Sequence, residues 1–292
     1  MENLPRASVS VVIPTRNREK LLTQILEDLS RQSLKPKIVV VIDSSDTELK
    51  IEKEDLNLVL LDSTIRSAAV QRNMGLDYLE KSKETYNYCA FLDDDIRIDS
   101  NYLNSLSDTL NHTRGAVGIS GLAISVNESS YKRNRFLDLV GYSGPEGSLT
   151  RGAINVPVRK ATAPVKVEWL IGCSLWDFES INSLRFEEDF MGQSLFEDVL
   201  FSVQASKFGF LIVDSNVRFT HHLAIENRPD DFEHYSSWVC NRFRLKRIFP
   251  EKFSMTSFVL VNLLVLGKLL VKRRFRGTWG ILTAHIWLGL KR

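Results

Sequence analysis

Three consecutive aspartates, Asp93, Asp94 and Asp95, end an apolar run in the stretch "YNYCAFLDDDIRID" at residues 86–99. Adjacent carboxylates repel each other, and the repulsion grows as the local dielectric constant falls. A divalent cation opposite them would offset that repulsion, since Mg2+ and Mn2+ accept hard oxygen ligands and can bind a diphosphate in turn. The triplet therefore predicts a metal site that serves a diphosphate.

Several other chemistries lack their sequence motifs. The segment "IPTRNRE" at residues 13–19 contains no glycine, so it lacks the tight turn that a dinucleotide pyrophosphate approaches. The chain contains no P-loop, no GxSxG elbow and no HExxH helix. Phosphatases of the haloacid dehalogenase class also carry spaced aspartates at a strand end. They have threonine or valine at the position of Arg97, so that class is disfavoured too.

Alternating strand and helix patterns surround the triplet. Continuous apolar runs predict buried strands at 9–14, 37–43, 56–62 and 88–93. A helical spacing of leucines follows Asn17, which we expect to cap that helix, and a second helical pattern covers 67–82. This alternation predicts an α/β fold with a mostly parallel sheet.

In such sheets ligands bind beyond the carboxyl ends of the strands. Pro14, Thr15 and Arg16 end the first predicted strand. Asp43 ends the second, and the aspartate triplet ends the fourth. We therefore expect these three segments to converge on one crevice.

The following segments are less regular. Apolar runs predict strands at 115–126 and 166–176, and the glycine-rich residues 141–153 predict a loop. Residues 194–210 predict a helix. No linker divides residues 1–250, so we expect one domain there.

Five segments, in order, resemble the landmarks of the family 2 glycosyltransferases. They are "VSVVIPTRNR", "VVVIDSSD", "AAVQRNMGL", "AFLDDD" and "LFEDVLFSVQASKFGF". The resemblance spans about residues 8–222 and implies a GT-A catalytic domain, with a Rossmann-like central sheet flanked by helices. It also implies an inverting transfer of a sugar from a nucleotide-diphosphate donor, with Mn2+ or Mg2+ as cofactor.

The resemblance further implies which residues bind the donor. Those expected to contact the nucleotide are Pro14, Thr15, Arg16, Asp43, Arg72, Asn73 and Asp93. Trp169 and Gly172 would lie beside the donor sugar and the acceptor, where a small residue lets the main chain approach the sugar.

Metal-binding and catalytic roles follow from the same resemblance. Asp95 and His222 would bind the metal, although the sequence does not separate His222 from His221. Asp198 would be the general base that takes the proton of the acceptor hydroxyl, and Glu197 would orient the acceptor. Without the resemblance, two acids at a helix start would indicate only a favourable interaction with the helix dipole.

The C-terminal part of the chain differs from the rest in charge. From Arg242 onward it has 12 Lys and Arg residues against the single acid Glu251, whereas the remainder has 26 basic and 35 acidic residues. Its longest apolar run, 258–271, is shorter than the roughly 20 residues of a spanning helix. We therefore predict that residues 251–292 form a helical tail on a membrane surface, and a helical hairpin buried on the sheet is the alternative. The side chains expected to face anionic headgroups are Lys272, Arg273, Arg274 and Arg276.

These patterns together predict a location and partners. Three widely separated cysteines and an N-terminus without a basic and apolar leader favour the cytoplasm. We expect a peripheral enzyme on the inner face of the cytoplasmic membrane, acting on a saccharide acceptor, polyprenyl-linked, in surface polysaccharide synthesis. Nucleic-acid binding is not expected, because the basic residues cluster with an apolar segment. Two alternatives are a degenerate glycosyltransferase fold acting as a membrane-bound scaffold and a sugar nucleotidyltransferase.

Overall fold

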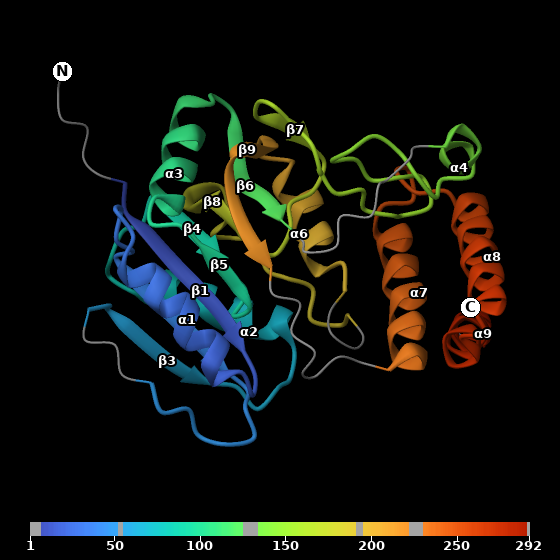
Figure 1. The fold of residues 1–292 in the computed structure, drawn as a ribbon, viewed down its shortest axis with the longest axis horizontal. Helices are drawn as coiled ribbons and strands as arrows, with labels where there is room; N and C mark the ends of the chain where they lie inside the picture. The colour runs from blue at the N-terminus through green and yellow to red at the C-terminus, as the bar shows by residue number, and fades with distance from the viewer. Residues whose placement is uncertain (1–6, 52–54, 125–133, 191–194, 222–229, 291–292) are drawn as a thin grey trace.

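The structure, a computed structural model, describes residues 7–51, 55–124, 134–190, 195–221 and 230–290 (Figure 1). Its strands are β1 (Val9–Thr15), β2 (Ile38–Asp43), β3 (Leu58–Asp62), β4 (Tyr88–Phe91), β5 (Ile96–Ile98), β6 (Ala116–Ile124), β7 (Val165–Val167), β8 (Ser174–Asp177) and β9 (Phe210–His221). Its helices are α1 (Glu19–Ser30), α2 (Ala68–Lys81), α3 (Tyr102–His112), α4 (Arg135–Leu139), α5 (Phe178–Ile181), α6 (Glu197–Ala205), α7 (Asp231–Ile248), α8 (Met255–Val271) and α9 (Phe275–Leu290).

The described strands form one mixed sheet in the order β3-β2-β1-β4-β8-β6-β9-β5, with β7 paired to β9. Strands β3, β2, β1 and β4 are parallel to one another, and so are β6 and β9. Strand β8 runs antiparallel to both β4 and β6. The predicted α/β fold is therefore confirmed, and the carboxyl ends of β1, β2 and β4 meet at one edge.

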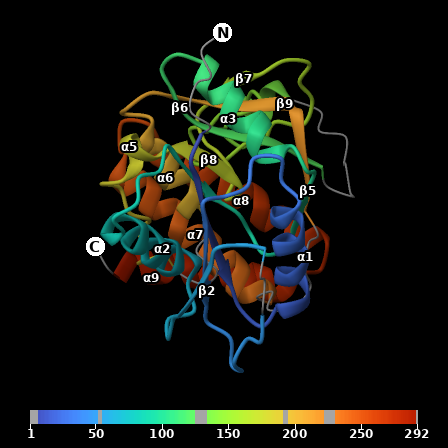
Figure 2. The same cartoon turned by 90° about the vertical axis from the view of Figure 1, so that its left-hand side faces the viewer.

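Helices cover both faces of the sheet because its central strands are apolar on both sides (Figure 2). On β1, Val9, Val11 and Ile13 belong to the cluster that contains the leucines of α1 and α3. Val12 points the other way, into the cluster that contains residues of α2 and α6. Burial on both faces explains why the strand is a continuous apolar run rather than an alternating one.

The start of α1 differs from the prediction. Asn17 does not cap the helix, because it has a φ of 54° and its side chain bonds to Asp46. Arg18 is the residue before the helix instead, and its side chain turns toward the aspartate triplet. A contact between distant segments thus outweighs the local preference of asparagine for the capping position.

The apolar run at 166–176 is two short strands rather than the single predicted strand. β7 and β8 are separated by residues 168–173, which belong to no strand. The main-chain nitrogen of Leu170 donates to the Ser202 hydroxyl of α6 at 2.9 Å. This irregular segment carries Gly172 to the carboxyl edge of the sheet.

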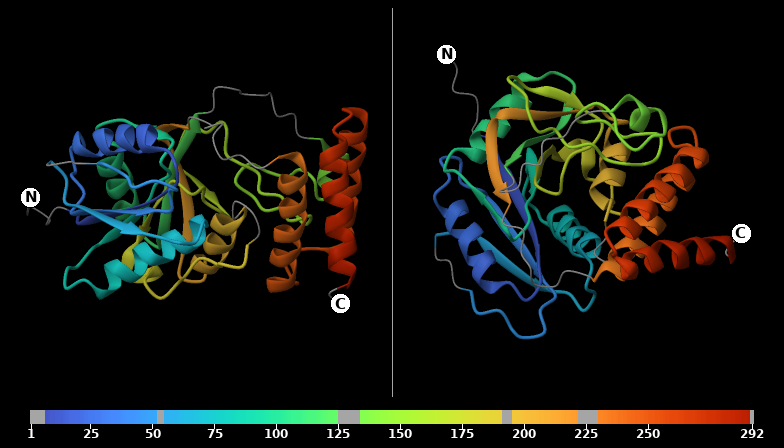
Figure 3. Two further views of the ribbon diagram at one scale, coloured as in Figure 1. Left: turned by 90° about the horizontal axis from the view of Figure 1, so that it is seen from below. Right: turned by 45° about the vertical axis from the view of Figure 1, so that its right-hand side comes forward.

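Three C-terminal helices pack together at the side of the molecule opposite β3 (Figures 1 and 3). Their shared core contains Val239 of α7, Phe258 and Val265 of α8, and Ile281 of α9. Helix α7 precedes the boundary that we predicted at residue 250, yet it shares this core with the two helices beyond it. Among the described helices, none has both the length and the apolar character needed to cross a bilayer.

A buried arginine connects these helices to the glycine-rich loop. Arg242 of α7 is 0% exposed, and its guanidinium donates to the main-chain oxygens of Gly152 and Ala153. It also donates to Asn262 Oδ1 of α8 at 2.7 Å. Arg242 therefore satisfies three buried acceptors from two segments that are distant in sequence.

Replacing this arginine should loosen the contact between the helices and the loop. We expect Arg242→Ala to lower the free energy of unfolding by about 3 kcal/mol, because three buried acceptors lose their donor. Urea-induced unfolding followed by circular dichroism measures the change. Arg247→Ala removes an exposed arginine from the same helix and should cost less than about 0.5 kcal/mol. Equal losses in the two variants would contradict the role of burial.

Candidate active site

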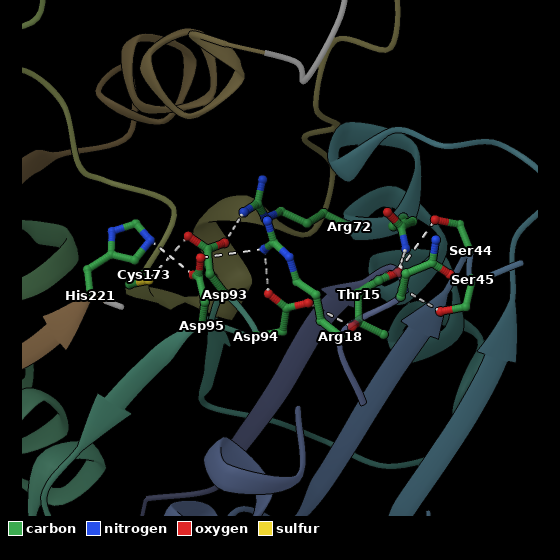
Figure 4. Close-up of polar contacts among 12 residues, drawn as sticks. Thr15, Arg18, Ser44, Ser45, Arg72, Asp93, Asp94, Asp95, Cys173 and His221 are labelled. Carbon is green, nitrogen blue, oxygen red and sulfur yellow. Dashed lines mark hydrogen bonds and ion pairs between the residues drawn. The ribbon is translucent and has the colours of Figure 1, made fainter. Parts of the chain in front are cut away.

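The aspartate triplet forms the turn between β4 and β5, at the carboxyl edge of the parallel strands (Figure 4). Asp94 is 4% exposed, and its Oδ2 atom accepts a hydrogen bond from the Thr15 hydroxyl at 2.7 Å. Its Oδ1 atom lies 2.9 Å from Arg18 Nη1. Burial raises the pKa of Asp94 to about 6, against the opposing effects of Arg18 and Thr15. The ends of β1 and β4 thus meet through side chains.

Asp93 and Asp95 approach His221, the last residue of β9. One potential ligand atom from each of the three residues lies within 4.8 Å of the others. His221 Nε2 is 3.0 Å from Asp95 Oδ1, and this hydrogen bond raises the pKa of His221. Two carboxylates and an imidazole suit a divalent cation such as Mn2+, so these residues fit the predicted metal. His222, the histidine that we predicted as a ligand, lies outside the described residues.

Arg72 of α2 connects the triplet to the acids of α6. Its Nη2 atom is 2.7 Å from Asp93 Oδ1, and its Nη1 atom pairs with Glu197. The arginine side chain is only 3% exposed, so carboxylates rather than water offset its charge. Although burial acts to lower it, the pKa of Arg72 is raised by Glu197 and Asp93. Arg72 therefore remains a fixed positive charge.

Gly172 lies directly against this ion pair. A Cβ atom at this position would stand 2.9 Å from Arg72 Nη2 and 3.3 Å from Asp93 Oδ1. The neighbouring Cys173 thiol lies 3.5 Å from the other oxygen of Asp93. A Cβ atom here would therefore press on the contact between Arg72 and Asp93, and Gly172 lies among the residues predicted to bind the donor.

The two acids Glu197 and Asp198 begin α6. They follow Phe196, whose φ of 74° lies in the left-handed region and turns the chain into the helix. Burial raises the pKa of Glu197 to about 7 and the pKa of Asp198 to about 6. Glu197 Oε2 is buried and has no hydrogen-bond partner in the part of the chain that the structure describes. Carboxylates with such pKa values are suited to proton transfer near neutral pH.

The end of β2 forms the other side of the crevice. Asp43 Oδ1 accepts a hydrogen bond from the main-chain nitrogen of Ser45 at 2.9 Å. Gln71 of α2 donates to the main-chain oxygens of Thr15 in β1 and Ile42 in β2, at 2.9 and 2.6 Å, and so joins the two strands near their ends. Pro14 is buried within β1, and Arg16 lies half-buried at the rim.

The side chains of two predicted residues, Asn73 and Trp169, form hydrogen bonds with main-chain groups outside the triplet. The side chain of Asn73 bonds to both the nitrogen and the oxygen of Phe186, at 2.7 and 2.9 Å. The indole nitrogen of Trp169 donates to the main-chain oxygen of Val156 at 3.2 Å. Neither side chain hydrogen-bonds to the residues of the triplet, and their expected roles beside the donor and acceptor stay predictions.

Arg18 belongs to the site but was not predicted. One signal was available in the sequence, because a cation just before a helix is opposed by the helix dipole. Such a residue needs an acidic partner elsewhere, and here Asp94 and Asp95 provide it.

Comparisons with known proteins agree with this geometry. The sequence model described as "Glycosyl transferase family 2" matches residues 10–165, more than half of the chain. The chain belongs to glycosyl transferase family 2. The matched range includes Arg72 and the aspartate triplet but ends before Gly172 and the acids of α6. A search of curated proteins found no significant match.

Solved structures with the same fold include three glycosyltransferases. GalNAc-T7 with UDP, GalNAc and Mn2+ superposes with a TM-score of 0.60 at 15% identity, over 85% of this chain and 48% of that one. S. aureus TarS superposes with a TM-score of 0.55 at 19% identity, over 82% of this chain and 40% of that one. The mannosyltransferase PcManGT from Pyrobaculum calidifontis, with GDP-Man and Mn2+, superposes with a TM-score of 0.54 at 15% identity, over 98% of this chain and 88% of that one. The family 2 protein therefore has the predicted GT-A-like fold, and it spans less than half the length of TarS and GalNAc-T7.

A side chain at position 172 should separate Arg72 from Asp93. We expect Gly172→Ala to weaken the binding of UDP or GDP by about tenfold, a loss of about 1.4 kcal/mol. Titration calorimetry measures the affinity. Gly267→Ala is the matched control, since a Cβ atom there meets nothing within 4 Å. An alanine at 172 that left the affinity unchanged would show that the Arg72–Asp93 contact is not needed for binding.

Proposed function

We propose that this protein is a metal-dependent inverting glycosyltransferase that moves a sugar from a nucleotide-diphosphate donor to a hydroxyl group of a saccharide acceptor. The observation that carries the proposal is the convergence of Asp93, Asp95 and His221 with the acid pair of α6 through one buried arginine, Arg72. A cation site beside potential general bases is what sugar transfer from a diphosphate requires.

The donor nucleotide would lie along the carboxyl ends of β1 and β2. Thr15, Asp43 and Arg16 would line the nucleoside pocket with Pro14, and Asp93 would contact the ribose. UDP is present in one structure of TarS, and GDP-Man in that of PcManGT. These related folds support a nucleotide-diphosphate sugar as the class of donor, and Asn73 would join the pocket only after release from Phe186.

Asp95, with Asp93 and a histidine of the 221–222 pair, would hold Mn2+ or Mg2+. The bound metal would orient the diphosphate and offset the negative charge that develops on it as it leaves. Arg72 adds a fixed positive charge beside Asp93. The chain thus supplies both the ligands of the cation and a permanent charge near the leaving group.

Asp198 would act as the general base. Its carboxylate would take the proton of the acceptor hydroxyl while that oxygen forms a bond to the anomeric carbon. The bond from the anomeric carbon to the diphosphate breaks in the same step, and its electron pair leaves with the diphosphate. Attack from the opposite side inverts the configuration without a sugar–enzyme intermediate. Glu197, whose Oε2 atom has no hydrogen-bond partner among the described residues, would orient the acceptor.

The test of this proposal is the release of nucleotide from UDP- and GDP-sugars with Mn2+ and a saccharide acceptor. Asp198→Asn should lower kcat by roughly 10²–10⁴-fold, the usual contribution of a general base, while the affinity for the nucleotide stays the same. Because the base must be deprotonated, kcat/KM of the wild type should fall as the pH is lowered through about 6.

Asp177→Asn serves as the control, since this aspartate caps α5 and lies outside the cluster. Its pH profile should match that of the wild type. Unchanged turnover in Asp198→Asn would exclude Asp198 as the base. Nucleotide binding without turnover of any sugar donor would favour the scaffold alternative.

We further propose that the acceptor is lipid-linked and that the protein works at the inner face of the cytoplasmic membrane, in surface polysaccharide or glycan synthesis. Helix α9 presents an exposed apolar stripe at helical spacing, formed by Phe275, Trp279, Leu282 and Ile286. Helix α8 presents a second one, with Val259, Leu260, Leu263, Leu270 and Val271. Contiguous apolar surface of this kind is typical of membrane or protein contacts.

The charges around these stripes favour a membrane. Residues 252–292 contain no acid, so a second copy of this face would bring like charges together. Arg274 and Arg276 are exposed, and they also pair with Asp231 and Asp230 at the start of α7. Lys272 and Arg273 are exposed and remain placed for anionic headgroups.

Vesicle binding tests the membrane contact. The double variant Trp279→Ser/Ile286→Ser should reduce binding to phosphatidylcholine–phosphatidylglycerol vesicles by more than about tenfold, since burying each large apolar side chain is worth about 1.5–3 kcal/mol. Co-sedimentation measures the bound fraction. Phe208→Ser removes an exposed aromatic residue beyond α6 and should have no effect. Equal binding by all three proteins would reject the stripe of α9 as the membrane contact.

A further inference from the structure

The positive charge of Arg18 lies where it would compete with a metal ion for Asp95. Its Nη1 atom is 2.9 Å from Asp94 Oδ1 and 3.5 Å from Asp95 Oδ2. Asp95 belongs to the candidate metal cluster, and its other oxygen is already 3.0 Å from His221. In the structure described here, both oxygens of Asp95 therefore face positively charged or hydrogen-bonding groups of the protein.

A divalent cation and the guanidinium of Arg18 cannot both approach Asp95 without strong repulsion between them. The buried Asp94 provides a second partner for Arg18, and Asp94 is itself fixed by the Thr15 hydroxyl at 2.7 Å. Arg18 could thus leave Asp95 while it stays beside Asp94. The side chain is 20% exposed, so it also borders the crevice in which a diphosphate would lie.

We propose that Arg18 couples metal binding to donor binding. Without ligands, Arg18 offsets the charge of Asp94 and Asp95 and lowers the affinity of the site for a metal. When the donor binds, its diphosphate becomes the new partner of Arg18, because a guanidinium matches phosphate oxygens in charge and geometry. Asp95 is then available to the metal, so each ligand strengthens the binding of the other. The inference rests on the proposed donor class and makes Arg18 a positioning residue.

Calorimetric titration of Mn2+ tests this coupling, with and without a saturating concentration of the nucleotide that binds, UDP or GDP. Without nucleotide, Arg18→Gln should bind Mn2+ at least about tenfold more tightly than the wild type, an effect that simple structural damage would not produce. The gain in Mn2+ affinity that nucleotide causes should be at least about fivefold smaller in Arg18→Gln than in the wild type.

Two further variants serve as controls. One keeps a positive charge at position 18, and the other removes an arginine at a different position. Arg18→Lys keeps a cation beside Asp95 and should restore the weak Mn2+ binding of the wild type. Arg66→Gln removes an arginine that pairs with Asp46 at the rim, and it should leave Mn2+ affinity unchanged. Circular dichroism of each variant confirms that the fold is retained.

The outcomes also distinguish this inference from the proposed function. Mn2+ affinity in Arg18→Gln that is equal to or weaker than in the wild type would overturn the coupling, whether or not sugar is transferred. Tighter Mn2+ binding and reduced coupling in a protein that transfers no sugar would support the role of Arg18 and count against the transferase function alone.

Discussion

The pairing of buried Arg72 with two carboxylates is the interaction on which the rest of the site depends. A guanidinium withdrawn from water is costly unless acids compensate it, and here the acids come from the turn after β4 and from the start of α6. Asp93 and Glu197 are 104 positions apart in the sequence. Their common partner therefore holds α2, the aspartate turn and α6 in one arrangement, and Gly172 lies directly against it.

The negative charge of the carboxylates in the crevice exceeds the positive charge of the side chains around them. Burial raises the pKa values of Asp94, Glu197 and Asp198, because each carboxylate has lost part of its hydration. Arg18 supplies some of the missing positive charge, and His221 forms a hydrogen bond with Asp95. An excess of negative charge of this kind favours the binding of a cation.

The basic residues of the C-terminal helices form one group in the sequence, but their contacts in the structure differ. Arg242 is buried and bonds to main-chain oxygens, and Arg274 and Arg276 fasten the start of α9 to the start of α7. Lys272 and Arg273 are exposed beside the apolar stripes. Arg274 and Arg276 are exposed too, but helix packing brings Asp231 and Asp230 within reach of them, so they also take part in ion pairs within the protein.

The sequence by itself determined the parts of this protein that follow from local pattern. Apolar runs buried on both faces predict the parallel strands, and their ends predict the edge at which Thr15, Asp43 and the triplet lie. Tertiary structure decided which side chains meet there. Arg18 contacts residues 76 and 77 positions away, and His221 contacts Asp95 across 126 positions. Asn73 turns toward Phe186 instead of the crevice. Such choices depend on packing between distant segments, which no local spacing encodes.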